Sequence, residues 1–485
     1  MQDKIDRSEA IRSGFSTKDA RVPTPPFWLS IIPIVVTAIV LGYSVFVLNA
    51  EPHFSLFIGG VTAGLCAYWN GTSWPLIKDG FRKAIDRTIP SLIILLIIGM
   101  LIGVWIISGI VPALMYISLE LVVARWFLPL ILIACSVMAL ITGSSWSTLG
   151  TIGVAAIGAG EAMGIPAEMT AGAVVSGSFF GDKISPMSDS TNLTPSVLGV
   201  NLFDHIKHML YTTVPSLAIT LVFFTILGVF ISQNGQVADV SRYTDYIQAQ
   251  FVLSPWLIIP PIGVIALILK KIPAIPSLIA GVVLGSVIYL TVQGGSLQIL
   301  SDVVYHGVVM ETGQSELDGL FTRGGLESMY SVVVLAFVSL AFGGIMNYTG
   351  MLHSIVLKLV ALLKYVGSLT ATVIVTSVLI NILAANQYLA VILPGQMYEE
   401  CYRNHRLKLK NLTRTLEAGG TLTAPLVPWN SSGVFVFISL GVPVVQYAPY
   451  AMLCWLTAII AIVYGFFGIT MEKTKRPDAE PEDQQ

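Results

Sequence analysis

The stretch GDKISPMSDSTN, residues 181–192, interrupts a segment that is otherwise apolar from 169 to 200. Pro186 has no backbone N–H to donate and pushes Ser185 away from helical geometry. A helix that enters this stretch is therefore expected to open at the proline and to resume beyond it. The sequence predicts a broken helix over 169–200.

The same stretch carries charge inside an apolar segment. Asp182 and Asp189 lie on either side of the expected opening, seven residues apart and so on one face of an ideal helix. Lys183 points elsewhere in a helix, so it is a charge partner for Asp189 or for an anion. Charges at membrane depth are costly and normally face a pathway or a partner. The alternative is a structural salt bridge that seals a kinked helix.

The composition of the chain indicates what surrounds this stretch. Of 485 residues, 54% are hydrophobic and 11% are charged, against roughly 25% charged in a soluble domain. Lipid is the solvent that such a chain requires. The net charge of −2 says nothing about nucleic acid, but the sequence has no basic block with interleaved aromatic residues, so no nucleic-acid partner is expected. We find no HExxH or GxSxG motif and no dinucleotide fingerprint, so neither an enzyme nor a cofactor is expected.

Apolar runs of membrane-spanning length recur along the chain. We expect spans at 27–48, 54–72, 89–112, 169–200, 211–232, 254–269, 274–293, 330–350, 414–440 and 447–470, with 169–200 and 414–440 broken. The stretches 127–160 and 370–398 are apolar but interrupted by small and polar residues. Each of these two either crosses once or folds back as a re-entrant hairpin.

The distribution of basic residues favours the re-entrant reading. With both stretches re-entrant and the N-terminus cytoplasmic, 22 of the 26 Lys and Arg lie on the cytoplasmic side, as the positive-inside rule demands. With single crossings the split is 19 to 6. We therefore expect ten crossings and two hairpins, with cytoplasmic tails at 1–26 and 471–485 and an external linker at 233–253.

The two halves of the chain, 27–232 and 254–470, repeat the same unusual features at a nearly fixed offset. Each half has an interrupted apolar stretch followed by a span broken at a proline, Pro186 in the first half and Pro428 in the second. Five crossings per half turn the second copy upside down. Inverted repeats whose sites form at broken helices are typical of secondary transporters.

Polar residues at the four interruptions are the candidate site. Backbone that leaves helical geometry at membrane depth must line a cavity or be buried in protein, and its carbonyl and hydroxyl oxygens suit a cation. The first hairpin tip supplies Thr142, Gly143, Ser144, Ser145, Ser147 and Thr148, and the first broken helix adds Ser185, Ser188, Ser190, Thr191 and Asn192. The second half supplies Asn386, Gln387, Thr423, Asn430, Ser431 and Ser432, none of them charged.

Three titratable residues outside these interruptions receive weaker predictions. Glu417 begins the second broken span and is expected near the cytoplasmic interface. His205 and His208, spaced three apart beside Lys207, are expected on the solvated face of an amphipathic stretch.

The motif GDKISPMSDSTNL resembles the signature of the NhaC family of bacterial Na+/H+ antiporters, and TGSSWSTLGTIGVA, from Thr142, is similar to its other marked stretch. The resemblance covers about 27–470, with Met187 where the family pattern has Leu. It implies exchange of transported Na+ for H+ in a bacterial inner membrane. It also implies an elevator-type transport domain, made of hairpins and broken helices, that moves past a scaffold. By the same resemblance, the early spans of each repeat are expected to form the scaffold, which is also the candidate interface of a homodimer.

A competition at one buried carboxylate would explain such exchange. Burial disfavours the charged form of an aspartate, so that H+ and Na+ compete for the same oxygens near neutral pH. Asp189 is our first candidate and Asp182 the second. The family also contains exchangers of malate and lactate, so a small carboxylate is the alternative substrate, and an amino-acid transporter of the same fold is a further one. A channel is another alternative class, and it would differ from an exchanger by conducting ions without moving a counter-ion.

Overall fold

The computed structural model describes residues 25–48, 53–121, 123–233, 240–270, 272–310, 321–360 and 366–474. Within these ranges the chain is helical between its turns, and the β-structure there is one isolated bridge, between Leu407 and Lys473. The prediction of an all-α protein is confirmed. Nearly all of the expected 1–26 tail, most of the 471–485 tail and residues 234–239 of the expected linker lie outside the described residues.

The first half contains two long spans and several shorter helices. In order they are α2 (Phe27–Phe46), α3 (His53–Trp69), α4 (Trp74–Ile107), α5 (Ile110–Leu121), α6 (Ala124–Thr142), α7 (Ser145–Thr148), the π-turn η1 (Leu149–Gly153), α8 (Val154–Ala162), α9 (Ala167–Ile184), α10 (Asp189–Leu198) and α11 (Leu202–Gln233). The expected linker 233–253 contains a helix, α12 (Val240–Gln250).

The second half is also helical within the described ranges. Its elements are η2 (Pro255–Ile258), α13 (Ile259–Leu269), α14 (Ala274–Thr291), α15 (Leu297–His306), η3 (Glu327–Met329), α17 (Tyr330–Tyr348), α18 (Met351–Val360), α19 (Val366–Ala384), α20 (Gln387–Asn404), α21 (Leu409–Leu416), the π-turn η4 (Glu417–Thr421), η5 (Ala424–Leu426), α22 (Ser431–Leu440), α23 (Val444–Tyr447) and α24 (Met452–Phe467).

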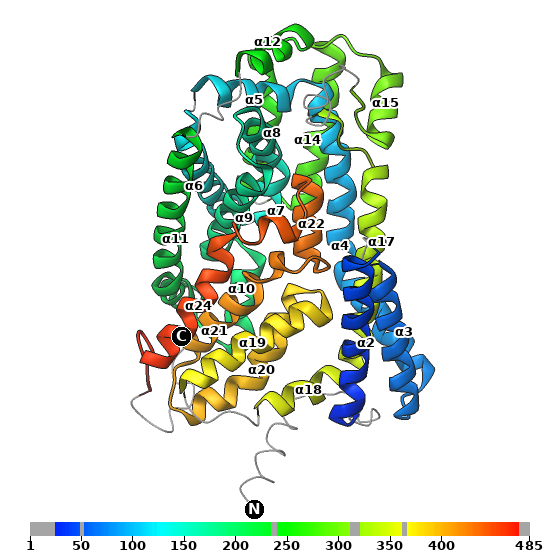
Figure 1. The fold of residues 1–485 in the computed structure, drawn as a ribbon, viewed down its shortest axis with the longest axis vertical. Helices are drawn as coiled ribbons and strands as arrows, with labels where there is room; N and C mark the ends of the chain where they lie inside the picture. Colours follow the sequence, from blue (N-terminus) through cyan, green and yellow to red (C-terminus); the bar gives the residue numbers. More distant parts are fainter. Residues whose placement is uncertain are drawn as a thin grey trace, which may run out of the picture.

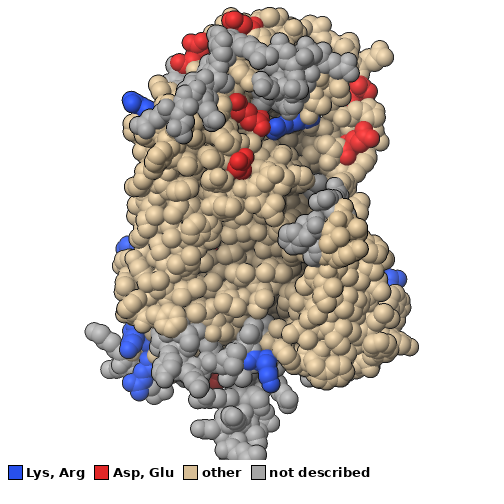
Figure 2. All heavy atoms as spheres, in the orientation of Figure 1, with Lys and Arg blue, Asp and Glu red and all other residues tan. Residues whose placement is uncertain are grey.

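The helices carry the apolar surface of a multi-pass membrane protein. Among the described residues three helices are long and apolar enough to cross a bilayer alone, within 124–142, 202–232 and 327–348, and two bent helix pairs add to them. Figure 2 shows a broad belt with few charged atoms, with acidic residues gathered at one end and basic residues mainly at the other. This belt is the surface expected against lipid.

The two interrupted apolar stretches fold as helix–turn–helix units that enter from opposite ends of the molecule. In Figure 1, α6 and α8 lie in the upper part, whereas α19 and α20 lie side by side in the lower part. The helix α6 packs extensively along α9, and α20 packs against α10. Both turns therefore bring their tips toward the middle of the long axis, where α9 ends.

The backbone repeats its irregularities at matching positions of the two halves. Gly143 (φ 67°) and Ala385 (φ 52°) are both left-handed at the hairpin tips. The next residues, Ser144 and Asn386, are both extended N-caps, with φ −149° and −142°. Glycine adopts the left-handed region without strain, whereas alanine does so at a cost. The strained Ala385 accepts a backbone hydrogen bond from Ser431, which helps to hold it.

Candidate functional site

A cavity of about 590 Å3 lies where the first hairpin tip, the first break and the second hairpin tip meet. Most of its lining consists of residues predicted from sequence: Thr142, Gly143, Ser144, Ser145, Ser147, Asp182, Pro186, Ser188, Asp189, Ser190, Asn192 and Gln387. Its remaining lining is Ile94, Trp146, Met187, Ile272, Pro273 and Tyr388. The cavity thus joins segments from both halves of the chain.

Asp182 is the buried carboxylate of this cavity. It lies in the last turn of α9, is 7% exposed, and accepts a hydrogen bond of 2.7 Å from the Ser145 hydroxyl of the hairpin tip. The helix ends two residues later because Pro186 follows, and Ser185 is extended (ψ 126°). The Ser185 hydroxyl donates to the Leu140 carbonyl of α6 at 2.8 Å, which ties the break to the hairpin.

Asp189 is the first residue of α10 and lines the cavity. It is exposed, and it occupies the first turn of a helix whose N-cap is Ser188. A carboxylate in this position is favoured by the positive end of the helix dipole. The Ser188 and Ser190 hydroxyls are 3.1 Å apart beside it. The two aspartates therefore differ in setting, since Asp182 is enclosed and Asp189 meets the open cavity.

The side chains of Thr191 and Asn192 stabilise the break in the helix by hydrogen bonds to backbone carbonyl groups. The Thr191 hydroxyl lies 3.1 Å from the Asp182 carbonyl and 2.8 Å from the Lys183 carbonyl, so it satisfies the end of α9. The Asn192 amide donates to the carbonyls of Pro186 and Ser188. These bonds replace those that the helix loses when it opens.

The left-handed Gly143 brings the hairpin tip directly against the break. A Cβ atom at this position would lie 2.7 Å from the carbonyl carbon of Met187, closer than real contacts allow. Its φ of 67° also suits glycine. The hairpin tip and the broken helix are therefore in backbone contact at the wall of the cavity.

The second half reaches the cavity through its hairpin tip and through Ile272 and Pro273. Gln387 and Tyr388 line the cavity, and the Gln387 side-chain oxygen accepts a 2.9 Å bond from the Ser432 hydroxyl behind it. Asn430 caps α22 and donates to Asn381, which itself donates to Thr423. These residues support the tip.

Several predicted residues lie outside the cavity lining. They are Thr148, Lys183, Ser185, Thr191, Asn386, Thr423, Pro428, Asn430, Ser431 and Ser432. Asn386 caps α20, and Pro428 lies in the turn before α22. Sequence reasoning missed Trp146 and Tyr388 as cavity residues. Trp146 follows directly after the predicted Ser145, and its ring stacks on Phe435 at 4.2 Å.

The prediction that His205 and His208 lie on a solvated face is wrong, because both side chains are buried. The His205 ring lies 2.9 Å from the Thr413 hydroxyl, and His208 lies 3.1 Å from the Thr470 carbonyl. Glu417 is also fully buried. Helix α11 packs against α21 and α24 at this end, and those helices cover the histidines.

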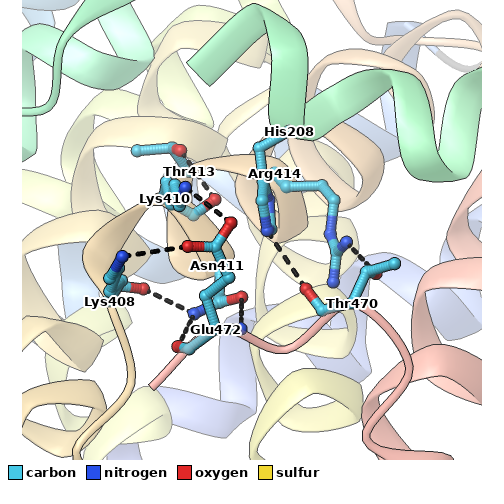
Figure 3. Close-up of polar contacts among 8 residues, drawn as sticks. All are labelled: His208, Lys408, Lys410, Asn411, Thr413, Arg414, Thr470 and Glu472. Atoms are coloured by element: carbon cyan, nitrogen blue, oxygen red, sulfur yellow. Dashed lines mark hydrogen bonds and ion pairs between the residues drawn. The ribbon is translucent and has the colours of Figure 1, made fainter. Parts of the chain in front are cut away.

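A cluster of charged groups lies at the N-terminal end of the second broken span (Figure 3). Glu472 accepts from Lys408 at 3.0 Å and from Lys410 at 2.6 Å, and its backbone pairs with Asn411. Arg414 donates to the Thr470 hydroxyl at 2.6 Å. The hydrogen bond from Lys410, together with that from Lys408, lowers the pKa of Glu472 to about 2.

The cavity offers oxygen ligands. Within the described ranges no three His, Cys, Asp or Glu side chains gather in a metal-binding group. An ion in the cavity would meet the Asp182 and Asp189 carboxylates and the surrounding hydroxyls, the hard ligands that an alkali cation prefers.

Comparison with known proteins identifies the class. The chain belongs to the Na+/H+ antiporter family, whose model matches residues 22–191 and 177–469. The Na+/H+ antiporter NhaC of Alkalihalophilus pseudofirmus is 36% identical over 451 residues, covering 93% of this chain and 97% of the relative. The resemblance to NhaC proteins drawn from the motifs is confirmed.

Relatives with other named substrates are nearly as similar. The malate-2H+/Na+-lactate antiporter of Bacillus subtilis is 34% identical over 466 residues, covering 96% of this chain and 99% of the relative. The arginine/ornithine antiporter ArcD of Halobacterium salinarum is 34% identical over 463 residues, covering 95% of each chain. The protein is thus a multi-pass membrane transporter of an antiport family.

Proposed function

We propose that this protein exchanges Na+ for H+ across the bacterial inner membrane by competition of the two ions at Asp182. The observation that carries this proposal is the enclosed Asp182 carboxylate, which receives the Ser145 hydroxyl and faces a cavity lined by oxygen atoms. Burial makes an uncompensated carboxylate unfavourable, so the site is stable only with H+ or Na+ bound. The empty charged site is held back, which makes exchange obligatory.

The difference in burial between Asp182 and Asp189 reverses the ranking of the two ion-binding candidates expected from sequence. Asp189 ranks first on the motif alone, yet its exposure leaves its charge solvated, and a solvated carboxylate does not require a bound ion. We therefore assign the shared H+/Na+ role to Asp182. Asp189 attracts the cation into the cavity and contributes a second carboxylate to its ligands.

The repeated backbone irregularities support the inverted-repeat plan. The left-handed residues and the N-caps recur at matching positions of the two halves, and the two hairpins enter from opposite ends. On this plan the units α6–α10 and α19–α22 form a transport domain that moves against a scaffold containing α2–α4, α13–α15 and α17. The basic end in Figure 2 is cytoplasmic by the positive-inside rule. As in the prediction from sequence, we assign both termini to the cytoplasmic side.

The assignment of Asp182 is tested with purified protein in liposomes that contain a pH-sensitive dye. A Na+ gradient drives proton movement in the wild type. Asp182→Asn abolishes it, because an amide takes up no proton in this pH range and carries no negative charge for Na+ to neutralise, whereas Asp189→Asn retains it at a higher Na+ requirement. Asp204→Asn, on an exposed position of α11, leaves it unchanged. Normal exchange by folded Asp182→Asn contradicts the proposal.

The cavity volume favours one second candidate, exchange of a small organic solute. About 590 Å3 exceeds the space of a single cation and falls within the range of small-molecule sites. Everted membrane vesicles distinguish the two functions. A pH response to Na+ without organic acid supports Na+/H+ exchange, whereas a response that requires malate, lactate or an amino acid supports the organic exchanger.

A further inference from the structure

The segment between α15 and η3 carries Arg323 at the acidic end of the molecule, where Figure 1 places α15. The backbone of this segment is fixed to the scaffold on both sides. The Gly325 amide donates to the Gly99 carbonyl of α4 at 2.7 Å, and the Arg323 carbonyl accepts from the Val308 amide, just after α15, at 3.0 Å. The main chain at Arg323 therefore belongs to the same body as α4 and α15.

Glycines make this attachment a close one. Gly307, Gly324 and Gly325 all have left-handed backbone, with φ of 89°, 87° and 81°. A Cβ atom on Gly324 would overlap the backbone of Gly103 in α4. A Cβ atom on Gly325 would overlap the backbone of Gly307. Main chains in such contact have little room to shift, so the Arg323 side chain extends from a fixed point.

The Arg323 guanidinium reaches two groups outside the scaffold. Its Nη2 atom lies 3.4 Å from Oε2 of Glu161 in α8, and its Nη1 atom donates to the carbonyl of Leu440, the last residue of α22, at 3.3 Å. The Arg323 and Glu161 side chains are only 27% and 30% exposed, so water screens the ion pair incompletely. A cation is also favoured at the C-terminal end of a helix such as α22.

Both groups that Arg323 reaches belong to the proposed transport domain. Glu161 lies in the helix that follows the first hairpin tip, and Leu440 ends the second broken span. The helices α8 and α22 are themselves in contact, so one guanidinium holds the point where the two repeats meet. The fork of the guanidinium suits two acceptors that lie side by side. Arg323 thus spans the boundary between the fixed and the moving parts.

We propose that Arg323, Glu161 and the Leu440 carbonyl form a latch that holds the transport domain in the position seen here and that must open in every transport cycle. This inference rests on the proposed function and on its division into scaffold and transport domain. By the positive-inside rule the latch lies at the external end. Because the Arg323 backbone is fixed to α4, a movement of α8 and α22 against the scaffold separates the latch groups.

The first test replaces the latch by a bond that cannot open. Glu161→Cys with Arg323→Cys is joined by a bifunctional methanethiosulfonate reagent long enough to replace both side chains. The cross-link abolishes Na+-driven proton movement in liposomes, and dithiothreitol restores it. The matched control is Glu399→Cys with Arg403→Cys, which replaces a 2.8 Å ion pair within the single helix α20. Its cross-link leaves transport unchanged, because one rigid helix carries both cysteines.

The second test weakens the latch instead. Arg323→Gln and Glu161→Gln each raise the maximal rate of exchange, because the transport domain leaves this position more readily. The increase is about twofold to fivefold, the range for a partly exposed ion pair. The double variant is no faster than Arg323→Gln alone, because Glu161 has already lost the partner with which it forms the latch.

The outcomes separate a latch from a structural contact. Normal exchange by the cross-linked pair, or failure of the cysteines to cross-link in folded protein, overturns the proposal. Rates that are unchanged or lowered in the glutamine variants, or effects that add in the double variant, also overturn it. If the cysteine pair does not fold, the rate of Glu161→Gln alone decides. Absence of Na+-driven proton movement in the wild type contradicts the proposed function instead.

Discussion

The hydrogen bond between Ser145 and Asp182 gives the most direct test of the cavity chemistry. Replacement of Ser145 by alanine removes the hydroxyl that lies 2.7 Å from the Asp182 carboxylate. Alanine is well tolerated in a helical turn such as α7, so the backbone of the hairpin tip should remain. The variant therefore changes the stabilisation of one charge in an otherwise intact site.

The expected effect follows from the energy of a buried hydrogen bond to a charged group, about 1.5–3 kcal/mol. The bond favours the carboxylate over the neutral acid, so its loss helps the proton against Na+. Because each 1.4 kcal/mol is a factor of ten, the Na+ concentration for half-maximal exchange should rise about tenfold to a hundredfold at fixed pH. Titration of Na+ against dye-reported proton movement in liposomes measures this change.

A matched control lies in the same hairpin. Ser136 is also buried in α6, but its hydroxyl donates to the Leu132 carbonyl within its own helix and does not reach the cavity. Ser136→Ala should leave the Na+ dependence unchanged, and Ser145→Thr should keep most of the wild-type affinity. A folded Ser145→Ala protein with the wild-type Na+ requirement would refute the role of this bond.

Three further predictions concern the fold. Gly181→Ala places a Cβ inside contact distance of the Ser136 carbonyl oxygen, so overpacking of about 1–3 kcal/mol should lower the melting temperature in detergent. Gly64→Ala, which has open space around it, should leave the melting temperature unchanged. Equal melting temperatures of the two variants would contradict the packing of α6 on α9. Asn430→Ala removes the cap of α22 and a bond to Asn381, and should cost about 1–2 kcal/mol in the same assay. Glu472→Gln should lower the melting temperature slightly, and by the same amount at every pH between 5 and 8. Because the pKa of Glu472 is depressed to about 2, its contribution is present above its ordinary range near 4.5 and is lost only as the pH falls through about 2. A difference that grows between pH 5 and 8 would contradict this assignment.

Local chemistry explains which parts of the fold were predictable. Proline acts on its own backbone and on the preceding residue, so the end of α9 at Ile184 could be located closely from Pro186. Glycine beside serine marked the tip at Gly143 in the same way. The constant offset between the two halves was visible because such irregular positions are rare in apolar sequence.

Side-chain direction was less predictable, because the helices are apolar on most faces and carry no clear polar stripe. The seven-residue spacing of Asp182 and Asp189 implies a shared face only if the helix continues. It ends between them, so one carboxylate is buried and the other exposed. For the same reason the burial of His205 and Glu417 could not be read from spacing: both are covered by helices distant in sequence.

The close approach of Gly143 to Met187 restricts how this scaffold can acquire new substrates. Where two main chains touch, no side chain can be enlarged, and trimming one opens no space. Differences in cargo size among proteins of this architecture are therefore expected where side chains rather than backbone contact border the cavity, for example at Ile94, Ile272 and Tyr388.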